Sequence, residues 1–176
     1  MTPLGNLFHQ WRVGRTCFMG LGNPGYGDDA FGVQLADELT KAGIPEVVIG
    51  GTAPEQRLGK IAAQNFDYLV FLDAVDFAAP PGSLVVMGAR QIQVRFPQIS
   101  THKISLSVLA EMVQANGRTK VWLVGVQPES IRQDKPVTPV VRATLEIVKA
   151  LILHGESGAA ILEAAAPGRK MEEYVC

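Results

Sequence analysis

Residues 20–32 read GLGNPGYGDDAFG. The apolar run TCFMGL at 16–21 ends in this stretch, and the helical spacing of Phe31, Leu35 and Leu39 begins in it. Apolar residues at every fourth position are typical of a helix that buries one face. The stretch is therefore predicted to be the turn between a first strand and a first long helix.

Apolar strands and helical patterns continue to alternate along the chain. Further strands are predicted at 46–51, 67–72, 82–88 and 120–126, and helices at 29–42, 54–64, 103–116 and 138–153. This order is typical of an α/β sandwich with a mostly parallel sheet. Within the helix at 103–116, we expect Ile104, Val108 and Met112 to form one stripe. Thr138 is expected to cap the last helix.

Composition limits the kind of protein that the chain can be. Its 176 residues suit one domain, and 47% of them are hydrophobic, which is typical of a globular protein. The 16 basic and 17 acidic side chains nearly cancel, so we expect neither a nucleic-acid nor a polybasic membrane surface. No apolar run approaches the roughly 20 residues of a membrane span. The opening MTPLGNLFHQWRVGR lacks the apolar core of a secretory signal, so a cytoplasmic protein is expected.

Three regions are expected along the chain. Residues 1–14 are interpreted as an N-terminal extension and residues 15–154 as a single α/β domain. Residues 155–176, rich in alanine and glycine with a polar end, are interpreted as a poorly ordered tail. The two cysteines, Cys17 and Cys176, are not spaced as C-x-x-C, and no disulfide framework is expected.

Acids and glycines follow several predicted strands at the point where each strand ends. Asp28 and Asp29 follow the first strand, Gly50-Gly51-Thr52 the second, Asp73 the third, and Gln127-Pro128-Glu129 the last. Taken singly, an aspartate at a helix start is usually a cap, and a glycine after a strand is usually a turn. Because ligands of parallel sheets bind beyond the carboxyl ends of the strands, the group together predicts a site at this edge.

The letters GLGNPG at 20–25 match the dinucleotide pattern G-x-G-x-x-G, but their surroundings do not. A pyrophosphate seat needs backbone N–H groups at a helix N-terminus, and an acid at the end of the second strand binds the ribose. Here that strand ends in Gly50-Gly51-Thr52, and Pro24 lacks an N–H group. Asp28 and Asp29 would place two negative charges beside the phosphates. A dinucleotide site is therefore not expected.

The same turn is similar to that of another enzyme family. GLGNPG followed by Tyr26 resembles the opening of the bacterial peptidyl-tRNA hydrolases, whose catalytic histidine follows in a threonine-arginine-histidine-asparagine stretch. The corresponding stretch here is Gly27-Asp28-Asp29-Ala30, which contains no histidine. The near-neutral charge also argues against a tRNA substrate. A peptidyl-tRNA hydrolase-like enzyme is kept only as an alternative.

Five motifs in chain order resemble the hydrogenase maturation endopeptidases. They are Gly20-x-Gly22-Asn23 with Asp28, Asp29 and Gly32; GGTAPE at 50–55; Asp73-Ala74-Val75-Asp76 with Pro81-Gly82; Ser100-Thr101-His102 with Leu106; and Gly125-Val126-Gln127-Pro128-Glu129. Any one of them is weak, but their order and spacing make the resemblance specific. GGTAPE and STHKISL are nearest the subgroup that processes hydrogenases of the formate-hydrogenlyase type.

The resemblance implies a fold, an activity and a ligand set. The implied fold is a three-layer α/β sandwich with a twisted, mostly parallel five-stranded sheet and helices on both faces. The implied activity is that of an endopeptidase that removes the C-terminal extension from the large-subunit precursor of a [NiFe] hydrogenase after nickel insertion. Nickel-insertion accessory proteins are further expected partners. The family's nickel contacts correspond to Asp29, Asp73 and His102, and the nickel is expected to be presented by the precursor.

Two carboxylates and one imidazole suit a borderline divalent ion such as nickel, and three protein ligands leave coordination positions open. Such a site would bind a metal ion whose remaining coordination positions are occupied by cysteines of the substrate. Asp28 is interpreted as a carboxylate at the helix start rather than as a ligand. Asn23, Asp28, Gly51, Thr52 and Gln127 are interpreted as substrate-binding or loop-shaping residues.

The mechanism of cleavage is left open by the sequence. Neither G-x-S-x-G nor H-E-x-x-H is present, so no serine triad or zincin is indicated. Cys17 lies within an apolar strand, where thiols are usually inert. A water activated by a carboxylate or by the metal remains, with Asp29 or Asp73 as the base of an aspartyl-type endopeptidase. The alternative is a non-catalytic protein that binds the precursor and senses nickel.

Overall fold

The computed structural model describes residues 2–95, 104–115, 117–155 and 157, so His102 and most of the predicted tail lie outside the described residues. One sheet contains the strands β1 Thr16–Leu21, β2 Val47–Gly51, β3 Tyr68–Ala74, β4 Leu84–Gly88 and β5 Lys120–Val126. Their order across the sheet is β2-β1-β3-β5-β4. All neighbours are parallel except β4 and β5, which are antiparallel. The predicted α/β fold with a mostly parallel five-stranded sheet is confirmed.

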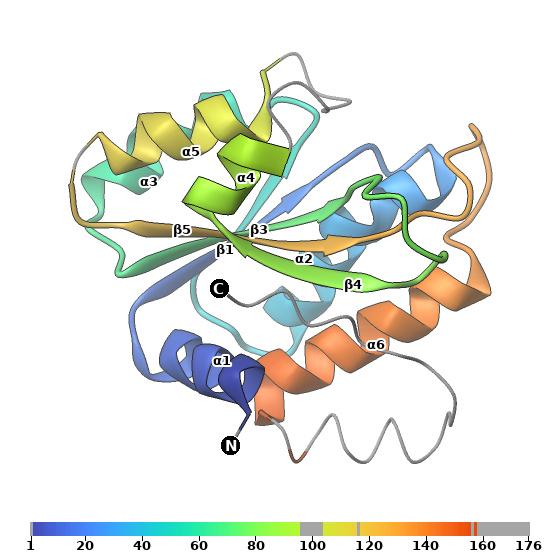
Figure 1. The fold of residues 1–176 in the computed structure, drawn as a ribbon, viewed down its shortest axis with the longest axis horizontal. Coiled ribbons are helices and arrows are strands. Elements are labelled where there is room, and N and C mark those ends of the chain that lie inside the picture. Colours follow the sequence, from blue (N-terminus) through green and yellow to red (C-terminus); the bar gives the residue numbers. More distant parts are fainter. Residues whose placement is uncertain (1, 96–103, 116, 156, 158–176) are drawn as a thin grey trace.

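Helices cover both faces of the sheet and give the molecule three layers (Figure 1). One face carries α1 Pro3–Val13, α2 Phe31–Lys41 and α6 Pro139–His154, and the other carries α3 Glu55–Ala63, α4 Ala89–Arg95 and α5 Leu106–Gln114. A short 3-10 helix, η1 Gly27–Ala30, joins β1 to α2. Within the described ranges, no helix combines the length and the apolar character that crossing a bilayer requires.

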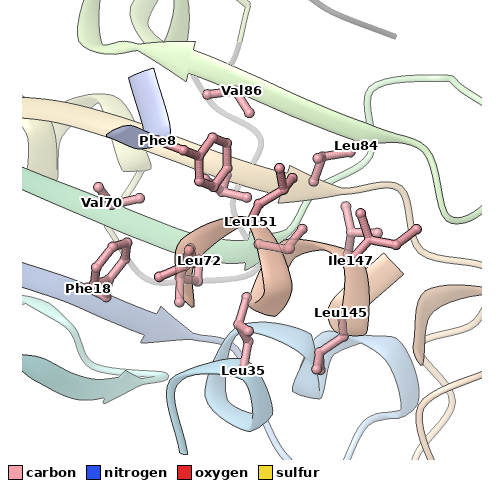
Figure 2. Close-up of a cluster of buried hydrophobic side chains, with 14 of the residues drawn as sticks. Phe8, Phe18, Leu35, Val70, Leu72, Leu84, Val86, Leu145, Ile147 and Leu151 are labelled. Atoms are coloured by element: carbon pink, nitrogen blue, oxygen red, sulfur yellow. The ribbon is translucent and has the colours of Figure 1, made fainter. Parts of the chain in front are cut away.

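The larger core cluster lies between the sheet and the layer formed by α1, α2 and α6. Figure 2 shows Phe8 of α1, Leu35 of α2 and Leu151 of α6 packed with Phe18 and Leu72 of the sheet. None of these five residues is more than 3% exposed. Burial of each such side chain contributes roughly 1.5–3 kcal/mol. A second cluster fills the space between the sheet and the layer of α3, α4 and α5.

Helix α1 occupies the segment that the sequence analysis expects to be an extension. The side chain of Thr2 accepts a hydrogen bond from the N–H of Gly5 at 3.0 Å and caps the helix. These residues are therefore a packed part of the domain, and the spacing of a buried helix face was present in the sequence. The large apolar side chains that α1 places in the core are Leu4, Leu7, Phe8 and Trp11.

The stripe predicted for α5 is only partly right, because Ile104 precedes the helix and packs against the core while Val108 and Met112 lie on its exposed side. Val108 and Met112 are 43% and 48% exposed. Apolar residues lie on both sides of this helix, so periodicity alone does not indicate which side is buried. The apolar residues that α5 buries are Leu106, Leu109, Ala110 and Val113.

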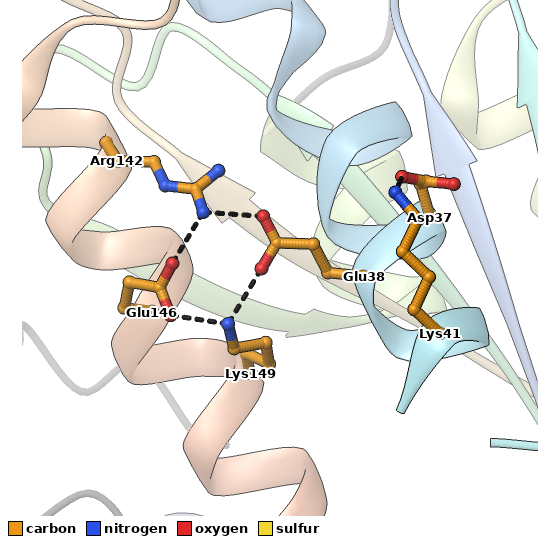
Figure 3. Close-up of polar contacts among 6 residues, drawn as sticks. All are labelled: Asp37, Glu38, Lys41, Arg142, Glu146 and Lys149. Atoms are coloured by element: carbon orange, nitrogen blue, oxygen red, sulfur yellow. Dashed lines mark hydrogen bonds and ion pairs between the residues drawn. The ribbon is translucent and has the colours of Figure 1, made fainter. Parts of the chain in front are cut away.

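Four charged side chains connect α2 to α6 (Figure 3). Glu38 of α2 pairs with Arg142 at 2.6 Å and with Lys149 at 2.7 Å, and Glu146 of α6 pairs with the same two cations. Partial burial disfavours the charged form of Glu38, but hydrogen bonds from Lys149 and Arg142 outweigh it and lower the pKa of Glu38. The network therefore adds polar contacts between α2 and α6 to their apolar packing.

Helix α2 begins in direct backbone contact with the sheet. A Cβ atom on Gly32 would lie 1.9 Å from the carbonyl oxygen of Leu72 and 2.5 Å from that of Leu21. Separations this short are impossible for a real side chain. The first turn of α2 thus fits against the ends of β1 and β3 only because residue 32 is glycine.

We expect Gly32→Ala to lower the free energy of unfolding by about 3 kcal/mol or more, because overpacking against backbone atoms cannot be relieved by a side-chain rotation. Gly59→Ala in α3 is the matched control, because a Cβ atom there meets nothing within 4 Å. That control should raise stability by about 0.4–1 kcal/mol. Urea unfolding of both variants measures the difference, and equal stabilities would contradict the proposed contact.

Candidate active site

Asp29 and Asp73 lie at the carboxyl edge of two neighbouring strands. In the register of β1 and β3, Gly20 is opposite Leu72, so both strands end at the same level. Asp29 lies in η1, a few residues after β1, and is 7% exposed. Asp73 directly follows Leu72 in β3 and is 3% exposed. The contact between Gly32 and the carbonyl of Leu72 fixes the segment carrying Asp29 beside the segment carrying Asp73.

One carboxylate oxygen of Asp29 accepts a hydrogen bond, and the other has no partner among the described residues. Oδ2 accepts a hydrogen bond from the N–H of Asn23 at 2.8 Å. Oδ1 is buried and has no hydrogen-bond partner among the described residues. A buried carboxylate oxygen is costly unless a donor or a cation reaches it. The turn itself is closed by Asn23, whose side chain accepts from Gly25 N–H at 3.0 Å.

Gly22 allows this turn to form. Its φ of 107° lies in a region that favours glycine, and a Cβ atom there would lie 1.8 Å from the carbonyl oxygen of Asp29. Any side chain at this position would push Asp29 away from the end of β1. The glycines of the opening motif therefore serve close packing around an acid, which differs from their role in a phosphate cradle.

Asp28 has a structural role, in agreement with its interpretation as a helix-start carboxylate. It is fully buried, and its oxygens accept hydrogen bonds from the N–H groups of Glu129, Ser130 and Thr138 at 2.7–2.9 Å. The hydroxyl of Thr138 donates a fourth bond to Asp28 at 3.0 Å. Thr138 is the N-cap residue of α6, as expected, but its side chain makes no capping hydrogen bond because its hydroxyl donates to Asp28 instead.

The contacts of Asp28 show that the segment beginning at Glu129 belongs to the site as far as Thr138, beyond the motif predicted at 125–129. Residues 129–138 form a loop that closes over η1, and Gly27 N–H also donates to the carbonyl of Lys135 at 3.1 Å. Asp28 and its donors are separated by 101–110 positions in the sequence. No local pattern marks such a pairing.

Gln127 shapes the loop that follows Asp73. Its side-chain oxygen accepts from the N–H groups of Phe77 and Ala79 at 2.9 and 3.3 Å, and its amide nitrogen donates to Asp76 at 3.1 Å. Hydrogen bonds from Ala78 N–H and from Gln127 lower the pKa of Asp76. The end of β5 thus holds the loop after β3 in one shape.

The end of β2 is joined to the same turn. The carbonyl of Gly51 accepts a hydrogen bond from Gly22 N–H at 3.0 Å. Thr52 follows and is exposed. Gly51 thus shapes the loop, whereas Thr52 is open to solvent at the edge of the site.

The third predicted metal contact cannot be placed. His102 lies in the segment 96–103, outside the described residues. Within the described residues, no group of three or more histidine, cysteine, aspartate or glutamate side chains is arranged to hold a metal ion. Asp29 and Asp73 therefore supply two carboxylates at one edge, and the complete set of three stays a prediction.

Comparison with known proteins decides the family. The model of the hydrogenase maturation proteases matches residues 33–154, well over half of the chain. The chain belongs to this family. The family interpretation and the assignment of the protein as a peptidase are confirmed, and the peptidyl-tRNA hydrolase alternative is excluded.

Individual maturation proteases show the same relationship. The chain is 32% identical over 140 residues to the hydrogenase 2 maturation protease of Escherichia coli (strain K12), covering 75% of this chain and 84% of that protein. It is 28% identical over 130 residues to the hydrogenase 3 maturation protease of the same strain, covering 73% and 82%. A [NiFe] hydrogenase maturation protease from Thermococcus kodakarensis KOD1 has the same fold, with a TM-score of 0.74, 29% identity and coverage of 90% and 99%.

Cys17 does not suit the role of nucleophile in this protease. It is buried in β1, and burial raises the pKa of its thiol to about 12, with a smaller contribution from Glu46. The thiolate, which is the reactive form, is therefore scarce at neutral pH. The expectation that Cys17 is inert agrees with its burial.

We expect Asp28→Asn to lower the free energy of unfolding by at least about 2 kcal/mol, because an amide nitrogen would face backbone N–H groups that are left without an acceptor. The amide protons of Glu129, Ser130 and Thr138 should then exchange faster with solvent. Asp37→Asn is the control, because Asp37 forms only an exposed ion pair with Lys41 and such pairs contribute about 0–1 kcal/mol. Unchanged exchange in the Asp28 variant would contradict the anchoring role.

We expect Cys17 to resist alkylation by iodoacetamide at pH 8 in the folded protein, because its pKa of about 12 keeps the thiol neutral. In urea the thiol returns to an ordinary pKa near 8.5 and should react readily. Mass spectrometry of the peptide containing Cys17 reads both states. Rapid labelling of the folded protein would mean that the thiol is reactive after all.

Proposed function

We propose that this protease removes the C-terminal extension from the large-subunit precursor of a [NiFe] hydrogenase, and that it does so only after nickel has been inserted. The observation that carries the proposal is the buried Oδ1 atom of Asp29, which has no hydrogen-bond partner in the described structure. It lies at the same edge as the buried carboxylate of Asp73. Two buried carboxylates at one edge suit a cation that arrives with the substrate.

The nature of the substrate is inferred from the relatives. Two are named as maturation proteases of hydrogenases 2 and 3, and the archaeal relative is named as a [NiFe] hydrogenase maturation protease. The formate-hydrogenlyase type is our choice of hydrogenase, from the GGTAPE and STHKISL motifs. In this proposal, nickel is part of the substrate and not a cofactor that the protease keeps.

The roles of the site residues follow from their chemistry. Asp29, Asp73 and His102 would contact the nickel of the precursor, because carboxylate and imidazole ligands suit a borderline divalent ion. Cleavage needs a water whose oxygen attacks the scissile carbonyl carbon while a base accepts its proton. That proton then passes to the departing amine nitrogen as the peptide bond breaks. We assign the base to one of the two carboxylates, since Cys17 is excluded by its raised pKa.

The decisive experiment compares nickel-loaded and nickel-free precursor. Each is incubated with the purified protease, and mass spectrometry measures the length of the large subunit. We expect shortening of the nickel-loaded precursor alone. Binding without shortening would favour the non-catalytic nickel sensor, and equal shortening of both forms would refute recognition through the metal.

We expect Asp29→Asn, Asp73→Asn and His102→Ala each to slow cleavage of the nickel-loaded precursor by at least about 10–100-fold, the loss typical of residues that merely support a metal ligand. The melting temperature of the two asparagine variants should stay close to that of the wild type, because the shape of the side chain is kept.

Two histidine variants are the matched controls for His102. His9 in α1 and His154 in α6 are exposed and distant in sequence from the site, so His9→Ala and His154→Ala should cleave at the wild-type rate. Wild-type cleavage by His102→Ala would remove this histidine from the mechanism. Loss of cleavage in the controls would show that the assay reports stability instead.

A further inference from the structure

β2 is an edge strand whose outer backbone groups are open. The N–H of Phe18 donates to the carbonyl of Glu46 at 3.0 Å, and the register places Phe18 opposite Val47 and Gly20 opposite Ile49. In a parallel ladder, alternate residues of the edge strand bond to its neighbour and the others face outward. The peptide groups of Val47 and Ile49 therefore point away from β1.

These outward groups have no hydrogen bond to another described residue, and β2 pairs with β1 alone in the described sheet. Ile49 is 43% exposed. At the opposite edge of the sheet, Leu84–Met87 of β4 are all buried. β2 is thus the more accessible of the two sheet edges.

The sequence of β2 does not protect this edge. Natural edge strands commonly carry charges, prolines or inward-pointing lysines that prevent pairing with another chain. β2 reads VVIGG and contains no charge and no proline. An edge of this kind accepts an extended peptide, whose main chain provides the hydrogen bonds.

The open edge leads into the candidate active site. Gly51, the last residue of β2, accepts the hydrogen bond from Gly22, and the next residue, Asn23, donates to Asp29. Among the described residues, a Cβ atom on Gly51 would meet only the carbonyl of Gly22, at 3.9 Å, so these residues leave space beside the end of β2. A chain lying along β2 therefore arrives at the edge that carries Asp29 and Asp73.

We propose that β2 is the docking edge for the substrate: the precursor segment next to the cleavage point adds to the sheet as an extra strand. This inference rests on the proposed function and names the surface through which the precursor is held. Main-chain groups of the precursor bond to the N–H and C=O groups of Val47 and Ile49. The segment is thereby kept extended as it passes over Gly51 toward the two carboxylates.

A proline at position 49 tests the pairing. Ile49→Pro removes the outward N–H group and leaves the bonds to β1 intact, a position at which edge strands tolerate proline. We expect kcat/KM for the nickel-loaded precursor to fall about tenfold, as the loss of a main-chain hydrogen bond implies. Ile49→Thr keeps the N–H group and the branched side chain, and should stay within about twofold of the wild type.

Three results would overturn the proposal. Ile49→Pro that is folded and cleaves at the wild-type rate would exclude pairing at this edge. Equal losses in the proline and threonine variants would indicate side-chain contact instead of strand addition. A wild-type dimer that Ile49→Pro converts to a monomer without loss of cleavage would assign the edge to a second copy of the chain. Size-exclusion chromatography with light scattering measures this last point.

Hydrogen exchange tests the same edge without any variant. The amides of Val47 and Ile49 should exchange rapidly in the free protease and slow at least tenfold when nickel-loaded precursor binds. The amide of Val48 faces β1 and is the internal reference, with slow exchange in both states. If the wild type binds but fails to cleave, the proposed cleavage fails while this measurement still decides the docking edge. Bound precursor without protection at Val47 and Ile49 would refute it.

Discussion

The start of α2 lies so close to the ends of β1 and β3 that no side chain fits between them. This close approach at Gly32 sets where the acidic residues come to lie. Asp29 lies about one helical turn before Gly32. Asp73 directly follows Leu72, whose carbonyl lies against Gly32. A side chain in this gap would move the helix outward and separate the two carboxylates. The site therefore depends on the lack of a side chain at residue 32 as much as on Asp29 and Asp73.

Three of the turns around the site are held by side chains that accept backbone N–H groups. Asn23 closes the turn after β1, Asp28 fixes the loop before α6, and Gln127 fixes the loop after β3. Side-chain acceptors of this kind satisfy the backbone N–H groups of irregular segments and so hold them in one shape. A substrate that meets such a frame does not have to order it, so less binding free energy is lost on association.

The sequence predicted what is local and periodic. The five strands could be recognised because apolar runs bounded by turn residues are local properties, and the common edge of Asp29 and Asp73 follows from the general rule for parallel sheets. The buried face of α5 could not be chosen, since Leu109 and Val108 both belong to apolar stripes. The partners of Asp28 could not be found either, because hydrogen bonds between distant loops leave no periodic trace.

The long separation between Asp28 and its donors also bears on how the molecule is made. Synthesis of roughly a hundred residues takes about 5–20 s on the ribosome. Throughout this interval Asp28 has been synthesised, while its donors Glu129, Ser130 and Thr138 have not been translated. An incomplete nascent chain thus contains Asp28 and Asp29 without the loop that holds Asp28 in the folded protein, so the frame of the site is complete only once the start of the last helix has been synthesised.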